Sequence, residues 1–281
     1  MGVGSYFVIK GSMEVGELVA STQYINIILL SIILMTFVVS LFPDAYASMK
    51  RIGEVLETEA SIVDDEEEEP ATTCKGTVEF RNVTFAYPGA EKPVIKGISF
   101  VSKPGETTAI IGRTGCGKSS IVKLIPRLYD TLFGDVYVDG VNVKDLKLEH
   151  LRELIGYVPQ KNVLFSGDIA SNLNFGDENG SEADWKEACR IACADEFVDK
   201  KDGVYHSVVA QGGTNFSGGQ RQRLAIARAV MKKPEVYIFD DSFSALDYKT
   251  DAALRKALKQ NVKDATVIIV AQRISTIMHA D

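Results

Sequence analysis

The pattern of apolar and polar residues divides the chain into two parts. Residues 18–42 contain no charged residue, and such a stretch is long enough to cross the hydrocarbon core of a bilayer. Glu14 and Glu17 precede it, whereas Lys50 and Arg51 follow it. Because basic residues are enriched on the cytoplasmic side of membrane helices, this bias places the downstream part in the cytoplasm. We therefore predict a membrane helix at about residues 18–42 that continues as a helix into water.

Two other kinds of segment have a similar composition. A buried helix of a soluble protein seldom runs so long without one charged residue. A cleaved signal peptide needs a basic region before the apolar stretch and small residues at a cleavage site after it, and neither feature is clear in this sequence. Both alternatives are therefore disfavoured.

From Gly76 onward the pattern changes to short apolar runs and helices separated by turn residues. Residues 77–87 alternate between apolar and polar, as in a strand. Asp139 and Gly140 stand between two apolar runs, which predicts a hairpin. Three short, continuously apolar runs are typical of buried parallel strands, and they cover residues 107–112, 235–240 and 265–272. The predicted helices cover residues 181–200 and 217–232. Strands and helices in this order predict an α/β fold.

Composition adds one feature to this picture, an acidic linker. The chain has 281 residues, of which 46% are hydrophobic, enough for one sizeable core or two modest ones. The net charge is -7, but six acidic residues stand together at 64–69. We expect this run to be a solvated linker over residues 61–75. The rest of the chain is nearly neutral and lacks the basic surface that nucleic acid would require.

The four cysteines have no spacing that indicates a disulfide or a zinc site. Cys189 and Cys193 are four residues apart, so we expect them on one helical face as free thiols in a core. Cys74 and Cys116 have no partner in the sequence pattern. Reduced thiols fit a cytosolic location for residues 74 onward.

The chemistry of the chain is indicated first by a phosphate-binding loop. The sequence GRTGCGKS at residues 112–119 fits the pattern G-x-x-x-x-G-K-[ST] between an apolar strand and a helix. Its residues are Gly112, Arg113, Thr114, Gly115, Cys116, Gly117, Lys118 and Ser119. Glycines let backbone N–H groups turn inward around phosphate oxygens. Lys118 would reach the β- and γ-phosphates, and Ser119 would ligate Mg²⁺. Cys116 is a variable loop position without predicted chemistry of its own.

Two adjacent acids supply the expected second half of this site. A phosphate loop needs a further metal anchor on a neighbouring strand, and the run at 235–240 ends in Asp240. Asp241 follows directly and stands where a base could orient an attacking water.

Together with further motifs, this site resembles that of the ATP-binding cassette (ABC) family. Residues 215–229 contain Phe-Ser-Gly-Gly-Gln followed by a basic helix, and Ser-Ala-Leu-Asp stands at 244–247. The sequence Tyr-Val-Pro-Gln at 157–160 looks like the family's glutamine loop, and Tyr87 matches its adenine-stacking aromatic residue. The resemblance covers residues 76–281. Residues 164–176 and the preceding membrane helix resemble the exporter branch of the family.

The resemblance implies a fold and its division into domains. Residues 76–281 would form a nucleotide-binding domain with a RecA-like parallel sheet core, an antiparallel β subdomain and an α-helical subdomain. The helical subdomain would cover about residues 162–232 and include Trp185. Residues 1–60 would be the C-terminal part of a transmembrane domain.

It also implies ligands and a role for each matching residue. The cofactors would be ATP and Mg²⁺. The ATP contacts would come from Tyr87, residues 112–119, Ser120 and Gln160. The metal ligands would be Ser119, Gln160 and Asp240. The signature residues Ser217, Gly218, Gly219 and Gln220 would contact ATP held by a partner cassette, and Asp247 would belong to the D-loop at the dimer interface. Tyr87 taken alone could equally be a core tyrosine. Arg221 and Arg223 are expected to be ion-pairing residues of a helix surface.

Two positions depart from the family pattern for hydrolysis. The position after the metal-binding aspartate is normally the glutamate base, and here it is Asp241. The switch histidine is replaced by Gln272. Aspartate is one methylene shorter, and a misplacement of about 1 Å can cost about 100-fold in rate. Glutamine can donate a hydrogen bond but cannot carry a proton or a positive charge. We therefore expect a degenerate site that binds ATP and hydrolyses it slowly.

This combination, and the unusual residues 210–220, resemble one half of a heterodimeric multidrug-type exporter. The partners would be a second exporter half, the lipid bilayer and a transported small molecule or lipid, at the plasma membrane and without nucleic acid. One membrane helix and an end at Asp281 lead us to expect a longer protein at both ends. Two alternatives remain, a soluble ABC-type ATPase of DNA repair or translation and a regulatory module that senses nucleotide.

Overall fold

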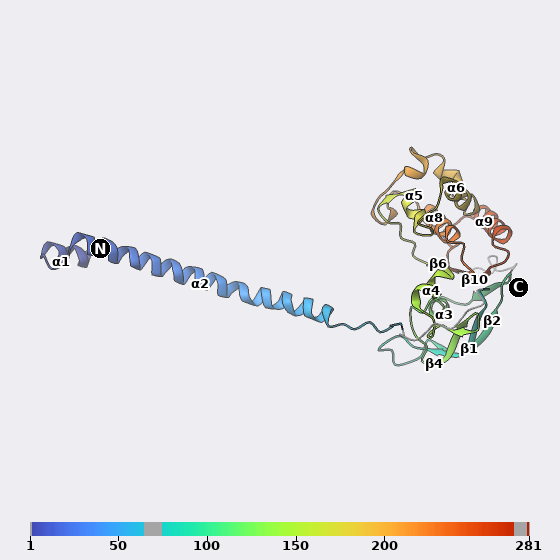
Figure 1. Ribbon diagram of the computed structural model, residues 1–281, viewed down its shortest axis with the longest axis horizontal. Coiled ribbons are helices and arrows are strands. Elements are labelled where there is room, and N and C mark those ends of the chain that lie inside the picture. Colours follow the sequence, from blue (N-terminus) through green and yellow to red (C-terminus); the bar gives the residue numbers. More distant parts are fainter. Residues whose placement is uncertain (1, 65–74, 273–279, 281) are drawn as a thin grey trace. The chain divides into compact units, whose positions relative to one another are not determined.

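The computed structural model describes residues 2–64, 75–272 and 280 (Figure 1). The chain forms two compact units, Met1–Ser61 and Ile62–Asp281. Most of the acidic run and Cys74 lie outside the described residues, so the linker and that cysteine stay predictions.

The first unit is helical, and its helices contain no buried residue. It contains α1 (Gly2–Ile9) and α2 (Val15–Leu56). The helix α2 runs without interruption through Pro43 and includes the whole apolar stretch at 18–42. None of its residues is buried. Among the described helices, α2 is the one that is long and apolar enough to cross a membrane.

The second unit is built around a parallel sheet. Its strands are β3 (Thr107–Ile111), β10 (Thr266–Ala271), β9 (Val236–Asp240) and β6 (Ile155–Val158), in that spatial order. The three continuously apolar runs are therefore confirmed as parallel strands. On β9, Tyr237 and Phe239 enter one hydrophobic core, whereas Val236 and Ile238 enter another. Both faces of the sheet are covered, which explains why these strands show no apolar–polar alternation.

An antiparallel sheet packs on one side of this core. Its order is β2 (Ile95–Ser102), β1 (Val78–Phe85), β4 (Phe133–Val138) and β5 (Val141–Asn142). The predicted hairpin joins β4 to β5, with Tyr137 opposite Asn142. Asp139 and Gly140 form its turn with φ of 53° and 81°, as a type I′ turn requires.

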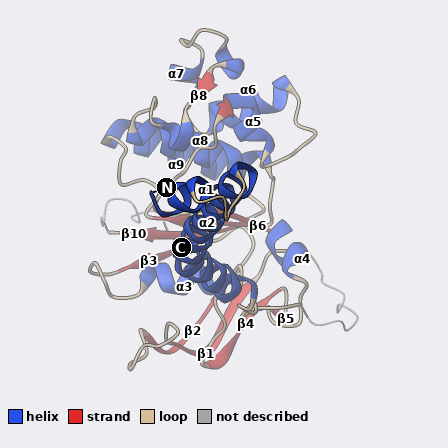
Figure 2. Cartoon of the chain, turned by 90° about the vertical axis from the view of Figure 1, so that its left-hand side faces the viewer, coloured by secondary structure: helices blue, strands red, loops and turns tan. Residues whose placement is uncertain are grey.

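A group of helices lies on the other side (Figure 2). It contains α5 (Ile169–Asn174), α6 (Glu182–Ile191), α7 (Asp195–Val198) and α8 (Gly218–Met231). Short segments connect them: β7 (Gly167–Asp168), β8 (Val208–Val209), and two 3-10 helices at Val204–His206 and Gln211–Gly213. Three further helices, α3 (Lys118–Leu124), α4 (Leu148–Glu153) and α9 (Tyr248–Asn261), complete the unit.

The structure corrects two expectations about these helices. The predicted helix at 181–200 is broken, because α6 ends at Ile191 and Cys193 has a left-handed backbone with φ of 52°. Cys189 and Cys193 therefore do not share one helical face. Cys189 is buried, and burial raises its pKa to about 12, which fits an inert core thiol.

The described residues show no ion pair for Arg221, whereas Arg223 forms the expected one with Glu196, and both side chains also bind backbone carbonyl oxygens. Arg221 donates hydrogen bonds to the carbonyl oxygens of Gly213 and Phe216, at 3.2 and 2.6 Å. Arg223 donates to the carbonyl oxygen of Cys193 at 2.6 Å, and its side chain is 14% exposed. Both guanidinium groups thus hold backbone segments that precede or flank α8. The weak ion pair of Arg223 with Glu196 at 3.4 Å is secondary.

Candidate functional site

The phosphate loop connects β3 to α3 and depends on two glycines with left-handed backbone. Gly115 and Gly117 have φ of 81° and 94°. At Gly117 a Cβ atom would come within 2.9 Å of a methyl group of Val94. Only glycine adopts this geometry at low cost, and it turns backbone N–H groups toward the concave side of the loop.

Lys118 begins α3 and folds back over the loop. Its Nζ donates hydrogen bonds to the carbonyl oxygens of Gly112 and Arg113, at 2.7 and 3.0 Å. The residue is only 8% exposed. A buried ammonium held by neutral carbonyls is placed to exchange them for phosphate oxygens, which are stronger acceptors for a cation.

Ser119 and Asp240 meet where the loop faces the end of β9. The Ser119 hydroxyl donates to Oδ1 of Asp240 at 2.7 Å, and the Tyr157 hydroxyl donates to Oδ2 at 3.3 Å. Asp240 is 1% exposed. Burial and the charge of Asp240 raise the pKa of Tyr157, so its hydroxyl stays protonated and donates. A serine hydroxyl beside a buried carboxylate presents the oxygen atoms that Mg²⁺ prefers, so the residues fit this ion.

Asp241 has a left-handed backbone conformation, and one oxygen of its carboxylate accepts two hydrogen bonds. Its φ is 51°, and its N–H donates to the carbonyl oxygen of Val270 at 3.1 Å. Gln160 and Gln272 both donate to its Oδ2, at 3.2 and 2.9 Å. Burial and the neighbouring Asp240 raise the pKa of Asp241, whereas hydrogen bonds and Lys118 oppose this shift. Both partners of the carboxylate are neutral amides.

Tyr87 packs in an aromatic group instead of standing free. Its ring contacts Phe85 and Tyr129 edge-on, with centroid separations of 4.9 and 5.1 Å. Its hydroxyl is 2.8 Å from the Ser120 hydroxyl. The side chain thus borders the phosphate loop and packs against the core, so adenine stacking by Tyr87 stays a prediction.

The signature residues lie apart from this cluster, at the start of α8. Ser217 caps the helix: Gln220 N–H donates to the Ser217 hydroxyl, and Ser217 N–H donates to the Gln220 side chain. Among the described residues, no hydrogen bond joins Ser217 or Gln220 to the phosphate loop. Asp247 caps α9 by accepting a hydrogen bond from Thr250 N–H at 3.0 Å.

The first turn of α8 rests on the loop that follows Asp241. A Cβ atom at Gly219 would lie 3.2 Å from the carbonyl oxygen of Ala245. Gln222 is 3% exposed, donates to the carbonyl oxygen of Asp241 at 3.4 Å and accepts from Ala245 N–H at 3.3 Å. The signature helix is therefore attached to the backbone of the acid pair.

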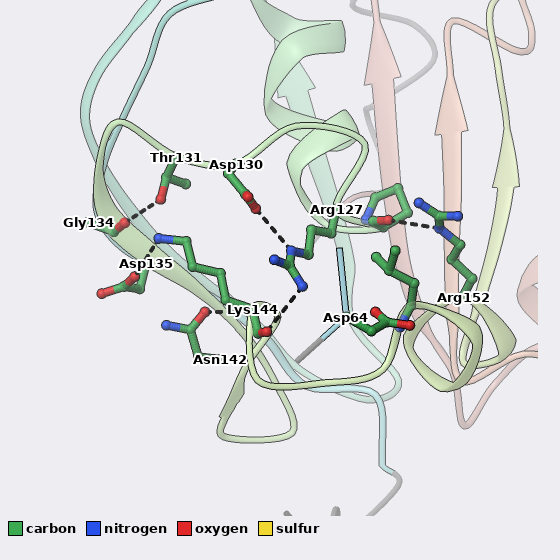
Figure 3. Close-up of polar contacts among 11 residues, drawn as sticks. Asp64, Arg127, Asp130, Thr131, Gly134, Asp135, Asn142, Lys144 and Arg152 are labelled. Carbon is green, nitrogen blue, oxygen red and sulfur yellow. Dashed lines mark hydrogen bonds and ion pairs between the residues drawn. The ribbon is translucent and has the colours of Figure 1, made fainter. Parts of the chain in front are cut away.

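A groove of about 300 Å³ lies beside the glutamine loop. Its lining includes apolar residues, the cations Arg152, Arg228 and Lys232, and Tyr157. Burial lowers the pKa of Arg228 and of Lys232. Figure 3 shows Arg152 donating to the carbonyl oxygen of Pro126, the residue before Arg127.

Asp64, the last described residue before the gap at 65–74, forms a hydrogen bond with the start of α4. Its Oδ1 accepts a hydrogen bond from Leu148 N–H at 2.9 Å, and Figure 3 shows this contact beside Arg152. The side chain thus satisfies a backbone donor in the first turn of a helix whose own N-cap residue, Lys147, makes no side-chain cap.

The structure thus gathers most of the predicted site residues around the end of the parallel sheet. The phosphate loop, Ser120, Gln160, Asp240, Asp241, Gln272 and Tyr87 are connected by the contacts above. Sequence reasoning missed Tyr157 and Gln222. Gln222 stands between apolar residues on the buried face of α8, and a polar residue on an apolar face is a signal that could have identified it. Tyr157 gives no such signal, because tyrosine is common in strands.

Comparisons with known proteins agree with this geometry. Residues 95–244, more than half of the chain, match the family model described as ABC transporter. An uncharacterized ABC transporter ATP-binding protein of Mycobacterium tuberculosis is 48% identical over 276 residues, which cover 97% of this chain and 47% of the relative. The ATP-dependent lipid A-core flippase of Haemophilus influenzae is 39% identical over 248 residues, 88% of this chain and 42% of the relative.

A solved structure shows the same architecture. A bacterial Atm1-family ABC exporter with ATP bound matches 96% of this chain and 47% of its own length, with a TM-score of 0.79 and 29% identity. The chain spans about half the length of the curated relatives it matches. The predicted fold class is confirmed, and α2 fits a membrane span with the nucleotide-binding domain on the cytoplasmic side. The phosphate loop, the acid pair and the family match lead to one conclusion: this chain belongs to the ABC transporter family.

Proposed function

We propose that the chain is the ATP-binding and ATP-hydrolysing half of an ABC exporter of multidrug type, and that its own nucleotide site hydrolyses ATP slowly. The observation that carries this proposal is the state of Asp241. The carboxylate at the base position accepts hydrogen bonds from Gln160 and Gln272 on the same oxygen. Neither of these amide groups can receive or relay a proton. A carboxylate whose hydrogen-bond donors are two such amides is a poor general base.

The remaining residues support binding of ATP. The backbone of residues 112–119 would surround the phosphates, and Lys118 would leave its carbonyl partners for the β- and γ-oxygens. Ser119 and Asp240 would hold Mg²⁺, which neutralises charge on the phosphate oxygens. Tyr87 would border the adenine. Among the described residues, no hydrogen bond joins these groups to the side chains of Asp241 and Gln272, whose bonds go to each other and to Gln160.

The signature would serve a different site. Ser217 is the exposed N-cap residue of α8 and is followed by the exposed Gly218, and the N-terminus of a helix favours an anion. Since no hydrogen bond among the described residues joins Ser217 or Gln220 to the phosphate loop of its own chain, we propose that Ser217–Gln220 complete the site of a second exporter half. In the proposed heterodimer the partner carries the competent base.

The membrane part completes the proposal. The exposed apolar surface of α2 requires lipid or other membrane helices around it. This helix argues against a soluble ATPase of DNA repair or translation. The transported substrate would be a small molecule or lipid, and the motions of the cassettes would drive its efflux at the plasma membrane.

The assignment is tested in the full-length transporter assembled with its partner half. We expect Asp241→Asn to leave most ATP turnover intact, because the partner's site supplies it. We expect Ser217→Ala to reduce turnover at least tenfold, because it removes a phosphate contact from that competent site. ATP hydrolysis by both variants is measured as phosphate release.

The control is Ser207→Ala, an equal truncation outside the described site. If Asp241→Asn abolishes turnover while Ser217→Ala leaves it unchanged, the degenerate-site assignment is wrong.

A further inference from the structure

The carboxylate of Asp240 has a second donor, Tyr157, to which the sequence motifs assign no role. We propose that Tyr157 is a positioning residue, which fixes the Asp240 carboxylate for Mg²⁺ through its hydroxyl. This inference rests on the proposed function as a metal–ATP site and adds a residue to it.

The geometry of two parallel strands delivers the hydroxyl to the carboxylate. Tyr157 on β6 pairs with Ile238 on β9, and both pack into the same hydrophobic core. Asp240 lies two residues beyond Ile238 and therefore on the same face of the strand. Two residues of a strand span about 6.6 Å, which is about the reach of a tyrosine side chain. The hydroxyl thus meets Oδ2 of Asp240 at 3.3 Å.

Each oxygen of the Asp240 carboxylate has its own hydroxyl donor. Ser119 donates to Oδ1 and Tyr157 donates to Oδ2. A Ser119 hydroxyl that ligates Mg²⁺ through a lone pair keeps its O–H for Oδ1, and the Tyr157 hydroxyl is the described side-chain donor that fixes Oδ2. Asp240 is 1% exposed, so bulk water cannot replace this donor. Hydrogen-bond partners behind metal ligands typically contribute 10- to 100-fold in metal affinity.

The position also connects the metal anchor to the groove. Tyr157 is one of the residues that line the groove, as are Arg152 and Phe175, and its hydroxyl donates to Asp240. Tyr157→Phe removes the hydrogen bond to Asp240 but retains the ring and its packing, so it separates the effect of the hydroxyl from the effect of the ring.

The test compares ATP binding with and without metal. In the full-length protein, the Kd for ATP is measured in EDTA and across a series of Mg²⁺ concentrations, and Mn²⁺ binding to the ATP complex is followed by electron paramagnetic resonance. For Tyr157→Phe we expect the same Kd in EDTA as for the wild type. We expect Mn²⁺ affinity to fall about 10- to 100-fold, with a corresponding increase in the Mg²⁺ needed for tight ATP binding.

Two variants serve as controls. Tyr237→Phe removes a hydroxyl from a buried tyrosine on β9 that makes no described hydrogen bond with Asp240, and it should leave metal affinity unchanged. Replacement of Tyr157 by p-aminophenylalanine retains an N–H donor at the same place and should restore metal affinity. This second variant also decides the matter if Tyr157→Phe fails to fold.

Unchanged Mn²⁺ affinity in Tyr157→Phe overturns the proposal, as does an equal loss of ATP binding in EDTA and in Mg²⁺, which would indicate a structural role. A p-aminophenylalanine variant with reduced metal affinity overturns it as well. If the wild-type protein binds ATP equally well with and without metal, the proposed metal–ATP site itself is wrong, and the role of Tyr157 falls with it.

Discussion

Asp241 combines an unusual backbone conformation with a carboxylate that accepts hydrogen bonds from two amides. Its left-handed backbone, with φ of 51°, is uncommon for a non-glycine residue. The hydrogen bond from its N–H to Val270 and the bonds to its carbonyl oxygen from Ser244 and Gln222 hold that conformation. The carboxylate is thereby directed between Gln160 and Gln272. Hydrogen bonds fix the backbone at position 241, whereas the aspartate side chain is one methylene shorter than glutamate and already accepts two hydrogen bonds.

The first prediction concerns two substitutions that should speed up ATP hydrolysis at this site. In a transporter whose partner site is inactivated, Asp241→Glu combined with Gln272→His should increase ATP turnover about 100-fold, because the carboxylate regains about 1 Å of reach and histidine can carry a proton. Each single change should give less than the pair. Turnover is measured as phosphate release under saturating Mg²⁺ and ATP.

Asp264→Glu makes the same chemical change at an exposed position and should not alter turnover. A double variant that is as slow as the wild type would show that the slow step does not depend on positions 241 and 272.

At the scale of elements, the helix α8 packs closely against the loop after β9 and forms hydrogen bonds with its backbone. Gly219 and Gln222 stand on the same side of α8, three residues apart, and both meet the backbone at Ala245. Close approach at Gly219 excludes a larger side chain without displacement of the loop. A shift of the signature helix therefore moves the backbone next to Asp241, which gives a physical route between the two nucleotide sites to which one chain would contribute.

Gln222→Leu is the corresponding prediction. The change removes the side-chain acceptor of the Ala245 N–H and one of the donors to the carbonyl oxygen of Asp241. Each lost hydrogen bond costs about 0.5–1.5 kcal/mol, so the loss of two should lower the free energy of unfolding by about 1–3 kcal/mol. Urea unfolding of the purified nucleotide-binding protein, followed by far-ultraviolet circular dichroism, measures it.

The exposed Gln260 on α9 offers a matched control, since Gln260→Leu removes the same amide from a solvated surface. Its effect should stay within about 0.5 kcal/mol. Equal effects of the two substitutions would contradict the attachment of α8 through Gln222.

At the scale of the whole molecule, the two units differ in what covers their apolar side chains. The second unit contains two hydrophobic cores, one on each face of the parallel sheet. The first unit contains no buried residue in α2. Its exposed apolar side chains include Ile28, Leu34 and Phe42, and such a surface is stable in lipid but not in water.

This difference predicts how each unit distributes between phospholipid vesicles and water. We expect the chain to float with phospholipid vesicles and to resist extraction at high pH, whereas residues 62–281 alone should remain in the aqueous fraction. A variant with Leu29 and Leu30 changed to Lys should lose vesicle association, because each lysine at the centre of a membrane helix costs about 2.5–3.5 kcal/mol. A control with two lysines at Glu57 and Glu59, beyond the end of α2, should still bind. Vesicle association by residues 62–281 alone would show that α2 is not the anchor.

Local patterns were enough to predict the strands that carry the site and the identity of its principal residues. The phosphate loop, the hairpin turn at Asp139–Gly140 and the buried strands at 107–112, 235–240 and 265–272 depend on neighbours in the chain, so the sequence alone indicates them. The membrane helix depends only on length and charge. These features need no knowledge of distant contacts.

Only the tertiary structure decided which distant side chains meet. The hydrogen bond from Arg223 to the carbonyl oxygen of Cys193 joins segments 30 residues apart in the chain. The same holds for the meeting of Gln160, Gln272 and Asp241, and of Tyr157 with Asp240. The physical reason is that a hydrogen bond buried between strands depends on their register and spacing, and the pairing of β6, β9 and β10 is a property of the folded sheet.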